Sequence, residues 1–264
     1  MTPPTAVLLP KVFPNDLVSL GQLVRNPLVP NINSYTKGCS KVTDDEISDP
    51  DIETPYNTIV STDTRGRFDI GLTKFLGVNL NAQSTNFLSI EAEKLVYTAL
   101  KDSSAAFKRI CDDDETKKWI GEMVLNKTPC YFVIGIQKLH NATFRRAILK
   151  SGGGSAYTTV PLEATAQIPL HIKGEVAGDR FGTSGATVNG VFGIQVQKLQ
   201  SKIVPSGKPG LENDVSWHWS YQRIKGTQQE EEKELHVKLE DVELSELREL
   251  LQQDGEGDDD DGEE

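Results

Sequence analysis

Two stretches of the chain alternate apolar and polar residues over an unusual length. In the first stretch, residues 68–80, the apolar positions are Phe68, Ile70, Leu72, Leu76, Val78 and Leu80. In the second stretch, residues 160–172, they are Val160, Leu162, Ala164, Ala166, Ile168, Leu170 and Ile172. Successive side chains of a strand point to opposite faces, so a period of two predicts a strand with one apolar face. Only Lys74 interrupts either row.

A shorter alternating stretch follows each long one, and each pair predicts a β-hairpin. The shorter stretch after 68–80 comprises Leu88, Ile90 and Ala92, and the one after 160–172 comprises Val188, Phe192, Ile194 and Val196. Elsewhere, the pattern predicts helices over 14–25, 94–123 and 242–253, with a helix boundary at Asp112–Asp114. It also predicts a loop over 36–57 and further strands over 130–136, 217–221 and 235–239.

The length of the two long strands admits two interpretations. The residues of 68–80, at about 3.3 Å each, span roughly 43 Å. Globular strands average about 5–6 residues, and membrane-crossing strands need about 9–11. A barrel wall with lipid outside and water inside fits such strands. A sheet packed on a soluble core alternates in the same way, and the pattern alone favours that interpretation.

A single hairpin of this kind would not be stable in lipid by itself. Burying about six apolar side chains favours insertion by on the order of 10 kcal/mol per strand. Each unpaired backbone group along the hairpin edges costs several kcal/mol in hydrocarbon, and only a closed ring of copies removes those edges. Insertion therefore requires oligomerisation, which predicts a concentration threshold.

Charge is distributed unevenly along the 264 residues, whose net charge is −11. From Gln228 to the end there are 17 acidic and 3 basic residues, a balance of −14. The preceding 227 residues carry 25 basic and 22 acidic residues, a balance of +3. A mildly basic body favours contact with anionic lipid, which an acidic tail opposes. No apolar run approaches the roughly 20 residues of a membrane-spanning helix, and no secretory signal is recognised.

The chemistry-bearing residue types form no recognisable catalytic or metal-binding pattern. The odd number of cysteines (Cys39, Cys111 and Cys130) indicates a reducing compartment, and their spacing fits no metal site. The four histidines lie far apart, and Gly152–Gly154 lacks the lysine of a phosphate-binding loop. We therefore expect no enzyme activity, no cofactor, no metal and no nucleic-acid partner.

The order of these elements resembles the pore-forming N-terminal domain of the gasdermins over residues 13–253. Arg67–Leu80 with Asn86–Lys94 resembles the first membrane hairpin of that family, and Val160–Ile172 with Val188–Leu199 resembles the second. Thr128–Leu139, continuing through Phe144–Lys150, is similar to its central strand. Glu234–Leu251 is similar to its last strand and linker helix, and 15–25 to its first, lipid-contacting helix.

The resemblance implies an α+β fold, in which a twisted antiparallel sheet has flanking helices and two long amphipathic hairpins. The hairpins convert to a membrane β-barrel on oligomerisation. It further implies one pore-forming domain over 1–253, a disordered acidic tail over 254–264 and no large C-terminal inhibitory domain. In this respect the chain resembles the shorter fungal gasdermin-like proteins, including the regulator-of-cell-death type that acts in allorecognition.

The same resemblance implies a cell-death effector that is cytoplasmic when inactive and lies in the plasma membrane when assembled. Its expected partners are acidic phospholipids (cardiolipin, phosphatidylserine or phosphoinositides) and further copies of itself or of an incompatible allelic variant. The residues expected to contact lipid are Lys11, Arg25, Lys37, Lys41, Arg145, Arg146 and Lys150. The residues expected to enter the membrane are Phe68, Ile70, Leu72, Leu76, Val78, Leu80, Val160, Leu162, Ile168, Leu170, Ile172, Phe192, Ile194 and Val196.

Other functions stay open on the sequence alone. A soluble β-rich module whose acidic tail holds basic partners, in the manner of histone chaperones, fits the same charge distribution. A short gasdermin activated by proteolysis fits the same order of elements. The acidic tail is either a restraint on premature assembly or a solubility tail, and each basic residue also fits an ordinary solvated surface charge.

Overall fold

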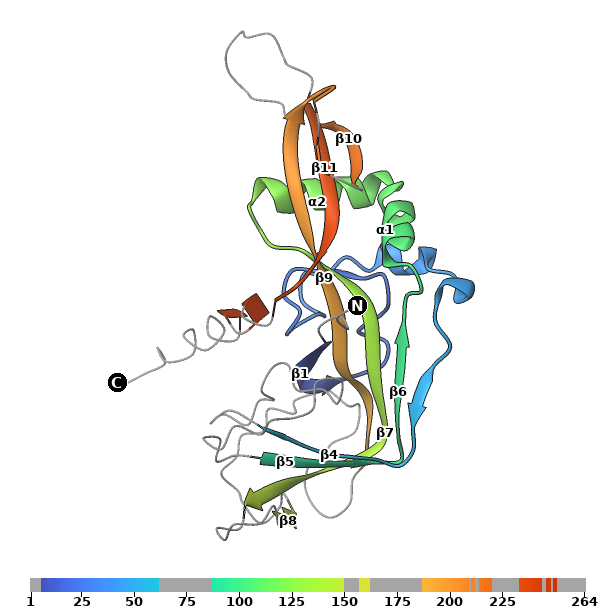
Figure 1. Cartoon of the computed structure of the whole chain (residues 1–264), viewed down its shortest axis with the longest axis vertical. Coiled ribbons are helices and arrows are strands. Elements are labelled where there is room, and N and C mark those ends of the chain that lie inside the picture. The colour runs from blue at the N-terminus through green and yellow to red at the C-terminus, as the bar shows by residue number, and fades with distance from the viewer. Residues whose placement is uncertain are drawn as a thin grey trace, which may run out of the picture.

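The computed structural model describes residues 6–61, 87–149, 157–161, 187–208, 210–211, 214–219, 233–243, 246–247 and 249–250. These residues form an 11-stranded, mostly antiparallel sheet flanked by helices, which confirms the expected α+β class. Figure 1 shows an elongated molecule in which β9, β10 and β11 reach one end and β4, β5 and β8 the other.

The strands vary greatly in length, and two of them run through most of the sheet. In chain order they are β1 Ala6–Phe13, β2 Leu23–Val24, β3 Asp51–Glu53, β4 Tyr56–Ser61, β5 Phe87–Ala92, β6 Lys94–Ala99, β7 Tyr131–Leu149, β8 Tyr157–Pro161, β9 Val188–Pro205, β10 Val215–Trp219 and β11 Lys233–Asp241. The helices are α1 Ser103–Cys111 and α2 Asp114–Leu125, and the 3-10 turns are η1 Lys37–Lys41 and η2 Asp44–Glu46.

The central strand β7 bends near Asn141 and so divides the sheet into two parts. Before the bend it pairs with β6 on one edge and with β9 on the other, and after the bend it pairs with β5 and β8. Asn141 has φ 50°, a left-handed conformation that asparagine tolerates better than most residues. Its backbone N–H donates to Asn189 Oδ1 at 3.0 Å and its side-chain amide donates to Glu93 Oε2 at 2.5 Å.

Strand β9 is paired along both of its edges. β7 follows one edge from Val188 to Lys198. β1 lies on the other edge between Val191 and Gln195, and β11 continues it from Gln197 to Pro205. The neighbours of β9 therefore fix it in the sheet over its whole length.

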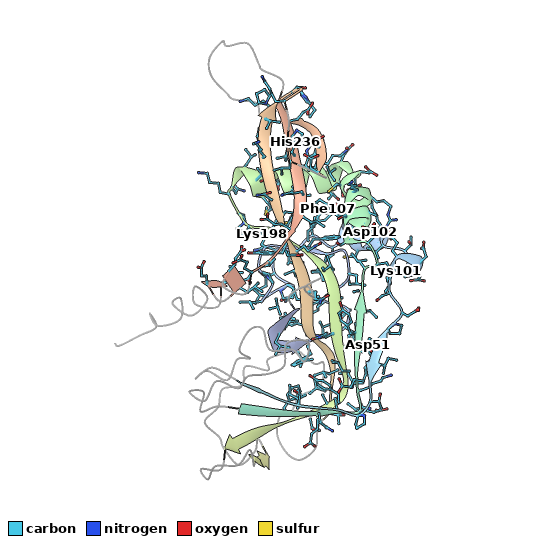
Figure 2. The ribbon with its side chains drawn as sticks, in the orientation of Figure 1. Asp51, Lys101, Asp102, Phe107, Lys198 and His236 are labelled. Atoms are coloured by element: carbon cyan, nitrogen blue, oxygen red, sulfur yellow. The ribbon has the colours of Figure 1, made fainter. Side chains whose placement is uncertain are left out.

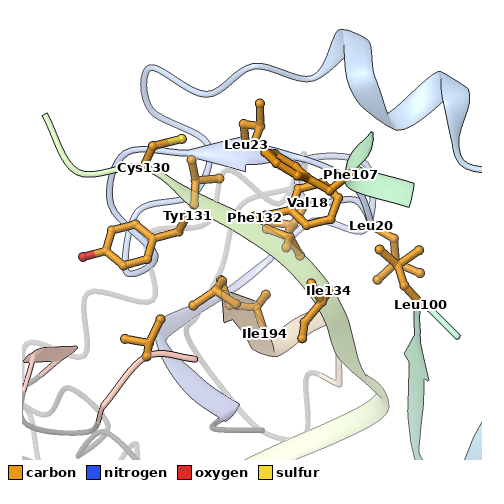
Figure 3. Close-up of a cluster of buried hydrophobic side chains, with 14 of the residues drawn as sticks. Val18, Leu20, Leu23, Leu100, Phe107, Cys130, Tyr131, Phe132, Ile134 and Ile194 are labelled. Atoms are coloured by element: carbon orange, nitrogen blue, oxygen red, sulfur yellow. The ribbon is translucent and has the colours of Figure 1, made fainter. Parts of the chain in front are cut away.

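Two hydrophobic clusters stabilise the sheet, and β1 contributes to both. The larger cluster lies between the sheet and the helices, and the smaller cluster lies near β5 and the bend of β7. Val7 and Leu9 enter the larger cluster and Leu8 enters the smaller one, because consecutive strand residues face opposite sides. Figure 3 shows the larger cluster, where Phe107 of α1 packs against Phe132 of β7.

The helix boundary predicted at Asp112–Asp114 is confirmed. Asp102 accepts a hydrogen bond from Ala105 N at the start of α1, and Asp113 accepts one from Thr116 N at the start of α2. Both are N-cap contacts, which satisfy backbone donors that a helix start leaves unpaired. α1 ends at Cys111 with Asp112 as its C-cap, and Asp113 is the N-cap of α2, so the boundary lies within the run of three aspartates.

The helix predicted over 14–25 is wrong, since these residues form turns and then β2. Gly21 has φ +80°, outside the helical range, and its N–H donates to Val133 O at 2.9 Å. Leu23 and Val24 pair with Phe132 and Tyr131 of β7. Val18, Leu20, Leu23 and Val24 are thus buried against the sheet, whereas Leu17 is exposed, and this pairing overrides the helical spacing.

Two further predictions need correction. The helical region expected from residue 94 begins only at Ser103, because Lys94–Ala99 form β6 on the edge of β7. The loop expected over 36–57 contains η1, η2, β3 and the start of β4.

The remaining predicted strands are confirmed where the described residues test them, and the last predicted helix is confirmed in part, since residues 242 and 243 are not helical. The strand expected over 130–136 is the start of β7, where Tyr131–Ile136 are buried. Strands are also present at β5, β9, β10 and β11 as expected. Residues 246, 247, 249 and 250 are helical, within the helix expected over 242–253.

Candidate membrane interface

The strands that flank both long alternating segments meet at one end of the sheet (Figure 1). Ser61 at the end of β4 pairs with Phe87 at the start of β5, so the two residues that flank segment 62–86 lie side by side. Segment 162–186 leaves from Pro161, which pairs with Arg145 of β7. It returns to β9 at Val188, which pairs with Ala142 of β7. The described residues that flank both segments therefore lie on the part of the sheet around the bend of β7.

Most residues expected to enter the membrane lie outside the described residues. These are Phe68, Ile70, Leu72, Leu76, Val78, Leu80, Leu162, Ile168, Leu170 and Ile172. Val160 lies on β8, opposite Arg146 of β7. Phe192, Ile194 and Val196 of β9 are buried in the two clusters, with exposed fractions of 1%, 0% and 2%. In this fold the apolar row of β9 is buried in the hydrophobic core, and its membrane insertion stays a prediction.

The pairing expected for the second hairpin is not present among the described residues. β8 and β9 do not pair with each other but follow one another along a single edge of β7. The opposite edge of β7 is held by β6 and then β5. A hairpin of 160–172 with 188–199 would require β9 to exchange at least one of its present partners.

The residues expected to contact lipid fall into separate places. Lys37 and Lys41 lie together on η1, beside α2, whereas Arg145 and Arg146 lie on β7 between β5 and β8. Lys11 belongs to β1, and Arg25 is half-buried just after β2. Lys150 lies outside the described residues. The structure therefore gathers two of the seven positions at α2 and two at the bend of β7.

Lys37 and Lys41 both pair with carboxylates at the start of α2, but in different surroundings. Lys37 Nζ lies 2.5 Å from Glu115 Oε2, and these two side chains are 68% and 63% exposed. Lys41 Nζ lies 3.2 Å from Asp113 Oδ1, and both side chains are about one third exposed. An ion pair in open solvent contributes little to stability, whereas one that is shielded and held by further bonds contributes more.

Asp113 is held by several donors at once. It accepts hydrogen bonds from Thr116 N at 3.0 Å and from Tyr35 Oη at 3.1 Å, in addition to the Lys41 contact. The Thr116 backbone bond, followed by Lys41, lowers the pKa of Asp113 to about 2. Asp113 therefore stays ionised and ties the loop before η1 to α2.

Two polar clusters were not anticipated from the sequence. His236 Nδ1 contacts Asp214 Oδ2, and its Nε2 lies 3.4 Å from Glu234 Oε2, on the β9–β11 ribbon where Figure 2 labels His236. Glu246 accepts from Tyr131 Oη at 3.1 Å and from Lys198 Nζ at 2.5 Å. Burial and the Glu246 charge raise the pKa of Tyr131.

Most of these contacts join residues far apart in the chain, so the sequence gives no local signal for them. Only Glu234 and His236 are close in sequence, two positions apart on one strand. The Glu246 contacts fix the segment after β11 to β7 and β9, where Leu247 is fully buried. In the part of the chain that the structure describes, no group of three or more His, Cys, Asp or Glu is arranged to hold a metal ion.

Among the described residues, no helix is both long enough and apolar enough to cross a membrane. In comparisons with known proteins, no family model and no curated protein matches this chain.

Proposed function

We propose that this protein is a gasdermin-like pore-forming effector of cell death. It binds acidic phospholipids, oligomerises and permeabilises the plasma membrane. The observation that carries the proposal is that the described strands next to the two alternating rows, β4 and β5 for the first and β8 and β9 for the second, lie together on the sheet around β7.

The length of each segment suits a membrane hairpin. The alternating rows 68–80 and 160–172 each span 13 residues, and a tilted membrane strand needs about 9–11. The register between Ser61 and Phe87 supports extension of β4 and β5 into such a hairpin without a change of partner. The second hairpin additionally requires the exchange of partners at β9 described above.

Assembly follows from the edges of these hairpins. Each inserted hairpin would leave unpaired backbone groups in hydrocarbon, and neighbouring copies remove them by closing a ring. A copy from an incompatible allelic variant fills the same place in the ring, which is how we propose that co-assembly in fungal allorecognition triggers the pore.

The test is dye release from vesicles by the purified protein. We expect release from vesicles that contain phosphatidylserine or cardiolipin, steep dependence on protein concentration and no release from neutral phosphatidylcholine vesicles. Mixing with an allelic variant should lower the threshold concentration. Intact anionic vesicles at every concentration, together with binding of histones through the acidic residues after Gln228, would instead establish the soluble binding module.

The two lysines of η1 should differ in their contribution to lipid binding. A lipid phosphate can replace Glu115 at Lys37, because that pair is exposed, whereas Asp113 holds Lys41. Lys37→Ala should weaken binding to phosphatidylserine vesicles about fivefold, as expected for one basic residue at an anionic surface. Lys41→Ala should lower the thermal midpoint and leave binding nearly unchanged, as measured by vesicle co-sedimentation at low salt. Equal loss of binding in both variants, at unchanged thermal midpoints, would contradict this distinction.

A further inference from the structure

A polar layer is buried where β6, β7 and β9 lie side by side. Gln137 of β7 and Gln195 of β9 are only 3% and 5% exposed. In the register of the two strands, Gln195 is opposite Gly135 and Gln137 is opposite Gly193. A Cβ at either glycine would lie 2.5 Å from the amide oxygen of the glutamine opposite. Each amide thus occupies space that a larger residue on the partner strand would fill.

The two amides differ in their hydrogen bonds. Tyr97 of β6 lies beside Gly135, and its hydroxyl donates to Gln195 Oε1. Two residues further along the same face of β9, Gln197 Oε1 accepts from Ser103 Oγ at 2.8 Å, and its Nε2 donates to Asp241 Oδ1 at 3.1 Å. Gln137 Oε1, by contrast, is buried with no donor among the residues that the structure describes.

A buried carbonyl oxygen without a donor destabilises the fold, because it has lost its hydrogen bonds to water and forms none within the protein. This cost would not persist in the barrel proposed above. If Phe192, Ile194 and Val196 face lipid, the alternate residues of β9 face the water-filled side. Gln137 pairs with one of these alternate residues, Gly193, and directly opposite residues share a face.

We propose that the Gln137 amide makes the monomeric fold metastable with respect to the pore. Its oxygen lacks a donor among the described residues while β6, β7 and β9 are packed together, and it regains water when β9 turns its Gly193 face to the water-filled side of the pore. The destabilising role rests on the monomeric structure alone, whereas the coupling to pore formation rests on the proposed function.

The test replaces Gln137 with methionine, which has a similar length and shape and no amide to satisfy. The thermal midpoint of the monomer should rise by a few degrees. Dye release from phosphatidylserine vesicles should slow about tenfold, which corresponds to about 1.4 kcal/mol of activation free energy. Circular dichroism verifies folding, and Gln137→Leu is a second variant with the same expectations.

Gln195→Met is the matched control, because it removes a buried amide from the same face but takes away the acceptor of Tyr97. Its thermal midpoint should fall. Midpoints of both position-137 variants at or below the wild-type value would overturn the destabilising role. A raised midpoint with unchanged release would overturn the coupling. Intact vesicles with the wild-type protein would refute the proposed function and with it the coupling, and the midpoints would still decide the role of Gln137 in the monomer.

Discussion

Replacing Leu170 with aspartate should abolish dye release from anionic vesicles and leave the protein soluble and folded. Leu170 belongs to the apolar row of 160–172, which the proposed barrel turns toward lipid. A carboxylate near the centre of the bilayer costs about 3 kcal/mol for each copy. Because every copy in the ring carries the substitution, the total cost grows with the size of the assembly. Release at the highest soluble concentration should therefore fall to the background rate.

Gln167→Asp is the matched control, since residue 167 lies three positions earlier on the opposite, polar row. A carboxylate there faces water in the proposed pore, so release should persist. Leu76→Asp and Asn79→Asp form the equivalent pair in the first segment. Unfolding of the Leu170→Asp and Leu76→Asp variants, detected by circular dichroism, would show instead that both rows pack an ordinary buried sheet.

The parts of the fold that the sequence predicts well are those in which one local signal dominates. β7 begins where a continuous apolar run follows Pro129, and β9 and β11 follow period-two patterns. The break between α1 and α2 lies at three aspartates, whose preference for helix caps is a local property. In each case burial by the rest of the molecule agrees with the local preference.

Predictions failed where a partner distant in the chain decides the structure. Residues 14–25 have helical spacing, but their backbone bonds to β7 instead. The Gly21 N–H donates to Val133 O, and Leu23 pairs with Phe132. Similarly, Leu95 and Ala99 fit a helical stripe, yet β6 pairs with β7 along its full length. The sequence of such a segment does not show that it will pair with a strand distant in the chain.

In the candidate membrane interface, too, the sequence predicts some features and misses others. Alternation locates the segments expected to insert, but it does not reveal that β8 and β9 share one edge of β7. The family resemblance selects Lys37 and Lys41, but it does not reveal their carboxylate partners at the start of α2, more than 70 residues away. The structure thereby distinguishes an exposed ion pair at Lys37 from a partly shielded one at Lys41.

Replacing Phe107 with alanine should produce the largest loss of folding stability among the substitutions considered. Phe107 is 2% exposed, and its ring centroid lies 5.4 Å from that of Phe132, at an interplanar angle of 63°. This edge-to-face contact attaches α1 to the first residues of β7 at the centre of the larger cluster. Truncation of a buried phenylalanine costs about 3–5 kcal/mol, because apolar contacts are lost and a cavity is left.

That loss is a large share of the roughly 5–15 kcal/mol that stabilises a typical domain. Urea denaturation followed by circular dichroism should therefore show a much lower midpoint for Phe107→Ala, with a similar slope. Lys108→Ala tests the same helix at an exposed neighbour and should change the free energy of unfolding by less than about 0.5 kcal/mol. A loss below about 1 kcal/mol for Phe107→Ala would mean that α1 does not depend on Phe132 for its attachment. A large loss would identify this contact as the place where the helices hold β7, with which β5, β8 and β9, three of the strands next to the segments expected to insert, are paired.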